Sequence, residues 1–178
     1  HELGIKIHLH CFTGGRPPQD ELDKYCESVN YYCRKKFPQG VLPGLPFIVS
    51  SRINKDLLIN LQKDDYPILM EGVHCSYYLY NGALKNRRVF VRLHNAEFAY
   101  YRKLASHENN FFKKLYFITE SFLLKRYERK IANKATFWPV SMSDTDLYKK
   151  EFGAKHIDFL PVFLPWHNVL IHHNNKGC

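Results

Sequence analysis

Two short runs of polar residues follow predicted strands, and these are the places where the sequence could do chemistry. His94 and Asn95 come directly after the segment 88–93, in which Val89, Val91 and Leu93 occupy alternate positions. A histidine at such a position can hydrogen-bond a phosphate or a sugar hydroxyl, or transfer a proton near neutral pH. A ring satisfied by a neighbouring loop carbonyl would account for it equally well. We take His94 as the candidate catalytic residue, and Asn95 and Glu97 as substrate-binding candidates beside it.

The preceding predicted strand ends in a similar way. Glu71 and Gly72 close the compact segment 68–71, and a glycine permits a tight turn or a close approach of the backbone to a ligand. An acidic residue that complements the start of the following helix would explain Glu71 without a ligand. Ser141 follows a third predicted strand. Because parallel strands bring their carboxyl ends to one edge of a sheet, Glu71, His94 and Ser141 are predicted to lie at the same edge.

Asp144, Thr145 and Asp146 match D-x-D, the metal–nucleotide motif of some sugar transferases. The motif stands at the start of a predicted helix over 141–152, where acidic residues complement the positive end of the helix dipole. Ser143, with Asp146 three residues on, resembles a capping box. We therefore favour a capping role for these carboxylates over metal binding.

Other signatures of metal or cofactor chemistry are absent from the sequence. It contains no G-x-G-x-x-G, P-loop, G-x-S-x-G or H-E-x-x-H motif. Cys26 and Cys33 lack metal-ligand spacing. His172 and His173 are adjacent and would not share a helical face, which favours a solvated tail. Neither a bound metal nor an organic cofactor is expected.

The elements that must position these residues alternate along the chain. Strands are predicted at 5–12, 29–33, 68–71, 88–93, 137–140 and 156–160. Helices are predicted at 18–26, around 57–61 after Asn54 as N-cap, at 77–83, over 96–135 with a break at 107–110, and at 141–152 before Gly153 as a stop. This alternation predicts an α/β fold, a Rossmann-like parallel sheet with helices on both faces.

Length and composition limit the number of domains and the kinds of partner that the protein can have. The 178 residues suffice for about one domain. The 26 Lys and Arg against 17 Asp and Glu give a net charge of +9, which favours anionic partners: phosphorylated substrates, an anionic membrane face or nucleic acid. The five cysteines include no C-x-x-C pair and are expected to be reduced intracellular thiols. No apolar run approaches the roughly 20 residues of a membrane-spanning helix.

The segment 111–134 has both a basic and an apolar character. It carries seven Lys and Arg against two Glu, while Phe111, Leu115, Ile118 and Phe122 share one helical face. We favour a helix packed by this face against the sheet, with a solvated basic rim, because the aromatic residues are needed as core. The alternative is a peripheral contact with an anionic membrane through 111–134.

Several motifs stand in a consistent order along the chain: residues 67–75 (PILMEGVHC), 91–97 (VRLHNAE), Tyr100 with Tyr101, 140–144 (VSMSD) and 159–161 (FLP). Together they resemble the N-terminal domain of GT-B glycosyltransferases. The likeness spans nearly the whole chain. It is nearest to bacterial, Bacteroides-type enzymes of the large retaining family that includes mannosyl- and glucosyltransferases.

The resemblance implies a function for each candidate residue. In such enzymes two Rossmann-like domains face each other across a cleft, and they generally work without a bound metal. His94 would touch the reacting sugar, and Glu71 with Gly72 would end the preceding strand at the cleft. Ser141 and Asp144 would open a later cleft helix.

The resemblance also implies a division of the chain. The N-terminal domain of these enzymes binds the acceptor, and the C-terminal domain binds the nucleotide-sugar donor. Residues 1–165 would form the acceptor-binding domain without its first strand and helix. Residues 166–178 would be a linker or the start of an absent donor-binding domain, so the 178-residue chain alone is expected to be inactive.

These observations leave three functions open. The first is the N-terminal half of a glycosyltransferase that moves a sugar from a nucleotide sugar to a lipid-linked or polysaccharide acceptor, in the cytoplasm or at the inner face of the cell membrane. The second is a non-catalytic, flavodoxin-like binding or interaction module. The third is a nucleic-acid-binding domain, motivated by charge and aromatic content alone. No RRM, KH or helix-turn-helix signature supports the third, so no nucleic-acid partner is expected.

Overall fold

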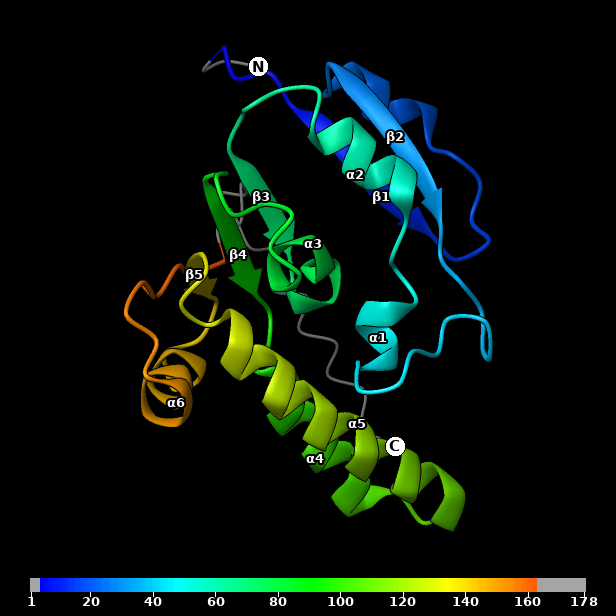
Figure 1. Cartoon of the computed structure of the whole chain (residues 1–178), viewed down its shortest axis with the longest axis vertical. Helices are drawn as coiled ribbons and strands as arrows, with labels where there is room; N and C mark the ends of the chain where they lie inside the picture. Colours follow the sequence, from blue (N-terminus) through cyan, green and yellow to red (C-terminus); the bar gives the residue numbers. More distant parts are fainter. Residues whose placement is uncertain (1–3, 163–178) are drawn as a thin grey trace, which may run out of the picture.

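A computed structural model describes residues 4–162 and shows an α/β fold in which parallel strands are flanked by helices (Figure 1). One sheet has the strand order β3–β4–β5, formed by β3 (Ile68–Glu71), β4 (Val89–Leu93) and β5 (Thr136–Pro139). All its strands pair in parallel, with Val91 opposite both Met70 and Phe137. The predicted Rossmann-like α/β class is thereby confirmed.

A second sheet is separate from the first, which corrects the expectation of one continuous sheet. It consists of β1 (His8–Thr13) and β2 (Ser28–Cys33), which are parallel. Within residues 4–162, the other edge of β1 pairs with no strand. A strand without a second neighbour is less covered, and every residue of β1 is exposed or half-buried, whereas Val91 and Leu93 in β4 are fully buried.

The strand expected at 156–160 is reduced to a single bridge between Ile157 and Phe137 of β5. The segment still runs beside β5, because the Leu160 N–H donates to the Pro139 carbonyl at 2.9 Å. Pro139 has no N–H to donate in return, so it interrupts the regular ladder of a strand pair.

Helices connect the strands, and their ends follow local capping signals. They are α1 (Phe47–Ser50), α2 (Lys55–Leu61), α3 (Tyr77–Tyr80), α4 (Glu97–His107), α5 (Phe111–Ile131) and α6 (Met142–Phe152), with 3₁₀ turns at Asp20–Lys24 and Val73–Cys75. Asn54 caps α2 as predicted by accepting the Asp56 N–H at 2.9 Å. Gly153 ends α6 with a left-handed φ of 60°. The predicted break at 107–110 separates α4 from α5.

Two predicted helices are shorter than expected. The helix expected at 18–26 is only the 3₁₀ turn Asp20–Lys24. The helix expected at 77–83 ends at Tyr80, because the chain turns at Gly82 with a φ of 87°.

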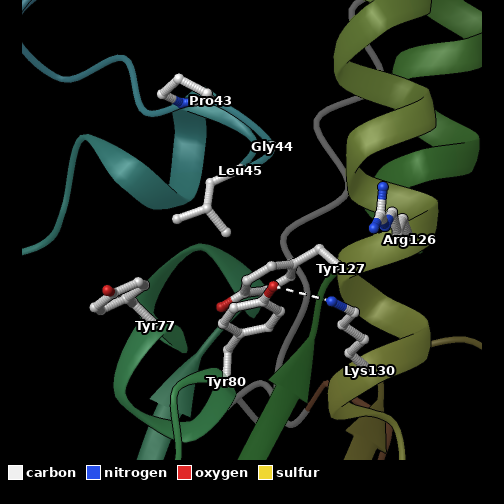
Figure 2. A pocket seen from close by; sticks show the side chains of 8 residues that line it. All are labelled: Pro43, Gly44, Leu45, Tyr77, Tyr80, Arg126, Tyr127 and Lys130. Carbon is white, nitrogen blue, oxygen red and sulfur yellow. Dashed lines mark hydrogen bonds between the residues drawn. The ribbon is translucent and has the colours of Figure 1, made fainter.

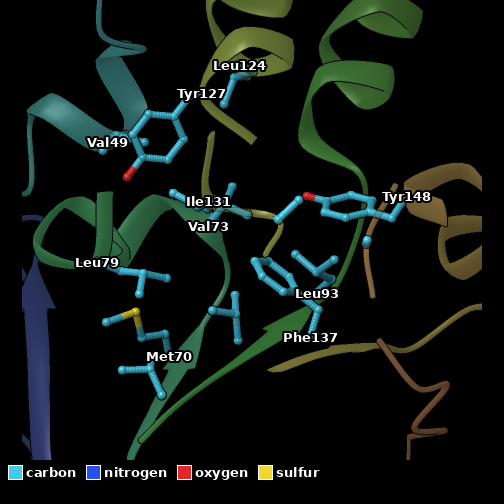
Figure 3. Packing of buried hydrophobic residues seen from close by; sticks show 14 of the residues in the cluster. Val49, Met70, Val73, Leu79, Leu93, Leu124, Tyr127, Ile131, Phe137 and Tyr148 are labelled. Atoms are coloured by element: carbon cyan, nitrogen blue, oxygen red, sulfur yellow. The ribbon is translucent and has the colours of Figure 1, made fainter. Parts of the chain in front are cut away.

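The core lies where the three-stranded sheet meets α3, α5 and α6 (Figure 3). Strands and helices contribute fully buried apolar side chains to it: Val91, Leu93, Phe137, Leu124, Ile131 and Tyr148. α4 and α5 pack closely against each other as a helical hairpin, which lies at the carboxyl end of the sheet (Figure 1).

The apolar face predicted for α5 does not face the core. Phe111, Leu115, Ile118 and Phe122 are all exposed, and the exposed fraction of Phe122 is 66%. The buried residues of α5 are instead Glu120, Leu124, Tyr127, Glu128 and Ile131. At 3.6 residues per turn these two sets lie on roughly opposite sides of the helix. The interpretation of the aromatic face as core was therefore wrong.

No helix within residues 4–162 is both long and apolar enough to cross a membrane. The predicted linker at 166–178, with His172 and His173, lies outside the described residues.

Candidate functional site at the carboxyl edge of the three-stranded sheet

The carboxyl ends of β3, β4 and β5 bring together residues from distant parts of the chain. Glu71 ends β3, His94 follows β4, and Ser141 follows β5. Because the strands are parallel and adjacent, these residues share one edge of the sheet, as predicted. Their functions in catalysis and substrate binding stay predictions.

Glu71 holds the ring of His94. The Nε2 atom of His94 lies 2.9 Å from Glu71 Oε2. A carboxylate only accepts hydrogen bonds, so Nε2 donates and carries the ring hydrogen. A neutral ring then presents Nδ1 as an acceptor. Arg92 lies 3.5 Å from the other carboxylate oxygen of Glu71. Since His94 and Asn95 are both exposed, a hydroxyl of a bound sugar could donate to His94 Nδ1.

Gly72 makes room for a second histidine. Its φ of 92° and ψ of 160° belong to a region that residues with side chains rarely adopt. A Cβ at this position would lie 2.7 Å from Cε1 of His74. Burial lowers the pKa of His74 to about 4, and the neighbouring Arg52, His94 and Arg34 add to this effect. The ring of His74 is therefore neutral at pH 7, and Gly72 has a packing function that the sequence did not indicate.

Asp144 ties the loop after β4 to the start of α6. Its Oδ1 accepts the Ala96 N–H at 3.2 Å, and its Oδ2 accepts the Ser141 hydroxyl at 2.9 Å. Ser141 is the N-cap of α6, and its Oγ accepts the Asp144 N–H at 3.1 Å. The capping pair is therefore Ser141 with Asp144, not Ser143 with Asp146 as predicted. Asp144 thus orients the loop that carries the exposed residues of the site.

The D-x-D carboxylates are in different surroundings. Asp144 is half-buried and hydrogen-bonded, whereas Asp146 is exposed. Within residues 4–162 no cluster of three or more His, Cys, Asp and Glu side chains could hold a metal ion. The geometry agrees with the capping interpretation of Asp144.

Glu97 begins α4 and is coupled to an arginine that the sequence analysis missed. Burial raises the pKa of the Glu97 carboxyl, and the charges of His94 and Arg52 partly offset that rise. Arg52 lies between α1 and α2 and donates to the Ile48 carbonyl at 2.5 Å. Burial and the neighbouring charge of Arg34 lower the pKa of Arg52. Glu97, His94 and the two arginines are thus close enough to influence one another.

Arg34 and Arg52 give the edge a cationic side. Arg34 donates through Nε to the Ser51 hydroxyl at 3.0 Å. No motif or spacing distinguishes these two arginines from the other cations in the sequence, and only the interaction of both with His74, and of Arg52 with Glu97, reveals them. Guanidinium groups bind phosphate, and carboxylates accept from hydroxyls. The edge is therefore suited to a ligand that carries both hydroxyl and phosphate groups.

Glu128 of α5 holds the start of α4 in place through a hydrogen bond to its backbone. One oxygen of Glu128 accepts the Phe98 N–H at 2.9 Å, and the other accepts the hydroxyl of Tyr148. Burial raises the pKa of Glu128 to about 8. Because the N-cap of α4, Ala96, has no capping side chain, Glu128 satisfies a backbone donor that would otherwise be unpaired.

A cavity of about 360 Å³ lies away from this edge, between the loop before α1 and the helices α3 and α5 (Figure 2). Tyr77, Tyr80 and Tyr127 line it together with Arg126 and Lys130. Lys130 donates to the Tyr80 hydroxyl at 3.3 Å. None of the residues predicted as site residues contributes to its lining.

Comparison with known proteins gives one distant relative. The chain is 29% identical over 150 residues to an uncharacterized 44.6 kDa protein in the cps region of Klebsiella pneumoniae. The match covers 82% of this chain and 38% of the relative, so the chain spans well under half the relative's length. No protein-family model matches the chain, and no solved structure matches it.

Proposed function

We propose that the chain is the acceptor-binding half of a retaining glycosyltransferase that moves a sugar from a nucleotide sugar to a lipid-linked or polysaccharide acceptor. The observation that supports this most is the convergence of Glu71, His94, Glu97 and Asp144 at one carboxyl edge. In open α/β sheets, ligands bind outside the carboxyl ends of the strands. The likeness of the same segments to the GT-B acceptor domain agrees with this location.

Each residue has a distinct task in the proposed reaction. The exposed His94 accepts a hydrogen bond from a hydroxyl of the reacting sugar, while Glu71 keeps its ring in one orientation and tautomer. Arg34 and Arg52 attract the phosphate groups of the substrates. Asp144 acts indirectly, since its hydrogen bonds to Ala96 and Ser141 hold the loop in place.

The transfer itself involves one bond exchange at the sugar. The acceptor hydroxyl oxygen bonds to the anomeric carbon, the bond from that carbon to the phosphate oxygen of the nucleotide breaks, and the hydroxyl proton passes to the released phosphate. The half that binds the nucleotide sugar would be supplied by a further domain. The relative is 44.6 kDa against 21.1 kDa for this chain, which leaves room for one.

The context of the relative agrees with a function in polysaccharide biosynthesis. That protein is described by its position in a cps region, and the chain aligns with it over most of its own length. Enzymes that extend polysaccharides act on glycan or lipid-linked acceptors, both of which carry hydroxyl groups. We therefore infer that the acceptor is a growing polysaccharide or its lipid-linked precursor.

The decisive test is sugar transfer by the full-length protein. Purified protein is assayed for release of nucleotide from a panel of UDP-, GDP- and ADP-sugars, with and without glycan and lipid-linked acceptors. His94→Ala should lower turnover by about 10²-fold or more. His156→Ala, a change at another exposed histidine, is the matched control and should leave turnover unchanged.

The proposal fails if no nucleotide sugar is consumed, or if His94→Ala is as active as the wild-type protein. A His94→Ala variant whose melting temperature drops by many degrees would indicate a structural function instead. Full activity of Glu71→Leu would contradict the assigned function of Glu71, since leucine cannot accept from Nε2–H and leaves the ring without its fixed orientation and tautomer.

A further inference from the structure

We propose that the outer end of the α4–α5 hairpin inserts into an anionic lipid bilayer. The outer half of α5, residues 111–119, and its next turn project beyond the core, and a set of large apolar side chains is exposed there: Phe111, Phe112, Leu115, Tyr116, Ile118 and Phe122. Tyr100 of α4 is exposed as well. Residues 111–118 form the apolar tip of the hairpin, while Tyr100 and Phe122 extend the exposed surface toward the start of α4, where the Ser121 hydroxyl donates to the Phe98 carbonyl at 2.8 Å.

Within residues 4–162, none of the side chains of the apolar tip belongs to the hydrophobic core. The face of α5 that packs on the core carries Leu124, Tyr127 and Ile131, on the opposite side of the helix from Phe111 and Phe122. Phe112 is 79% exposed. A contiguous exposed apolar patch of this kind indicates a binding surface.

The cations beside the tip indicate which surface binds there. Arg102, Lys103, Lys113 and Lys114 are all exposed, and none forms an ion pair with another residue in the described part of the chain. Lysine is depleted in protein–protein interfaces, whereas lysine and arginine next to aromatic residues are typical of elements that bind anionic membranes. The chemistry therefore fits an anionic bilayer better than another protein.

The position of the hairpin links this contact to the candidate site. α4 begins at Glu97, beside His94, and ends at His107, next to the tip. Its 11 residues span about 16 Å. A bilayer at the tip would thus lie within reach of the phosphate and first sugars of a lipid-linked acceptor bound at the carboxyl edge. This last step rests on the proposed function, but the membrane contact itself does not.

The test is binding of the full-length protein to phosphatidylcholine vesicles with and without phosphatidylglycerol, measured by sedimentation. We expect binding to the anionic vesicles that weakens as salt rises. The combined variant Phe111→Ser, Phe112→Ser, Phe122→Ser should weaken this binding by at least about tenfold, since aromatic burial is lost. The matched control Phe37→Ser removes a phenylalanine that is 76% exposed elsewhere and should bind like the wild type.

Two further variants separate charge from insertion. Lys113→Gln with Lys114→Gln should weaken binding to anionic vesicles, whereas Lys149→Gln with Lys150→Gln, an exposed pair on α6, should not. Phe112→Trp preserves the apolar character and reports insertion by a blue shift of its fluorescence on vesicles, with Phe37→Trp as the control that does not shift. The wild-type spectrum is subtracted to remove the emission of the native tryptophans, two of which lie in this chain.

Clear outcomes would overturn the inference. One is that the wild-type protein does not bind anionic vesicles at low salt. The others are that the triple serine variant binds as tightly as the wild type, or that the Phe112→Trp emission does not shift. A dimer that Phe112→Ser dissociates, with no vesicle binding, would show that a second copy covers the tip. Because His94→Ala should bind vesicles normally, failure here is distinguishable from failure of the proposed reaction.

Discussion

The two halves of α5 carry similar numbers of apolar residues and yet have opposite surroundings. The outer half exposes its aromatic face, while the inner half, residues 120–131, buries two glutamates, Glu120 and Glu128, in the protein. The inner half lies against the starts of α1 and α4, and the outer half contacts α4, its partner in the hairpin. The comparison teaches that the core face of this helix is defined by what lies opposite it.

The buried glutamates satisfy helix starts that lack capping side chains. The N-caps of α1 and α4 are Pro46 and Ala96, and neither offers a side-chain acceptor. Both carboxylate oxygens of Glu120 lie 2.9 Å from the Phe47 N–H, and Glu128 accepts the Phe98 N–H. Burial of a carboxylate is unfavourable, and hydrogen bonds from unpaired backbone donors offset that cost.

The largest effect should come from Glu128→Ala. It leaves the Phe98 N–H and the Tyr148 hydroxyl buried without a partner and creates a cavity, so we expect the free energy of unfolding to fall by about 4 kcal/mol. Denaturant unfolding monitored by circular dichroism measures the change. Glu128→Gln, which keeps an acceptor, should lose less than half as much. Equal losses for both variants would contradict the capping explanation.

A smaller effect is expected from Gly72→Ala. The change places a Cβ 2.7 Å from the His74 ring at a φ of 92°, which should lower the free energy of unfolding by about 3 kcal/mol. The same substitution at Gly14, where a Cβ would meet nothing within 4 Å, is the control. If Gly72→Ala melts at the wild-type temperature, the close packing of His74 on this glycine is wrong.

The pH dependence of stability should distinguish two buried groups. Glu128 binds its proton more tightly in the folded protein, since its pKa rises from 4.5 to about 8, so its contribution to stability declines as pH rises through this range. His74 has a lowered pKa, about 4 instead of 6.5, so its contribution to stability declines as pH falls from 6.5 to 4.

Between pH 6.5 and 8 only the first of these two effects operates. There the free energy of unfolding of the wild type, relative to Glu128→Gln, should fall with pH by up to about 1.4 kcal/mol per pH unit. Chemical unfolding at a series of pH values measures the slope. Parallel pH profiles for the two proteins would show that Glu128 does not titrate in this range.

The smallest effect should come from Phe112→Ala in the outer half of α5, where the side chain is 79% exposed. We expect the free energy of unfolding to change by no more than about 0.5 kcal/mol, because the side chain packs on little. Tyr127→Ala, in the inner half, should cost about 3 kcal/mol, since Tyr127 is buried and hydrogen-bonded to Ser76. Similar losses at both positions would remove the contrast between the two halves of the helix.

The order of strands and helices was accessible from the sequence because local patterns encode it. Val89, Val91 and Leu93 alternate as a buried strand requires. Asn54 marks the start of α2 and Gly153 the end of α6 through their own local preferences. The common edge of Glu71, His94 and Ser141 followed from the rule that parallel strands end together. Each of these inferences needs only a few neighbouring residues.

The predictions that were wrong, and the residues that were missed, share a different cause. The aromatic face of α5 was interpreted as core because Phe and Leu are usually buried, but burial depends on which elements lie opposite. Arg34 and Arg52 were missed because their neighbours His74 and Glu97 are distant in sequence. The division into two sheets was not predicted either, because strand pairing depends on two segments of the chain at once, and a local pattern describes only one of them.

By itself the sequence determined the α/β class, the element order and the edge at which polar residues gather, because periodicity and turn residues act over a few positions. The tertiary structure decided what those residues do there. It paired His94 with Glu71, occupied Asp144 with the loop at Ala96, and turned Glu128 inward as the cap of α4. These contacts join segments 23 to 48 residues apart in the chain, and their energies depend on burial that only the assembled protein creates.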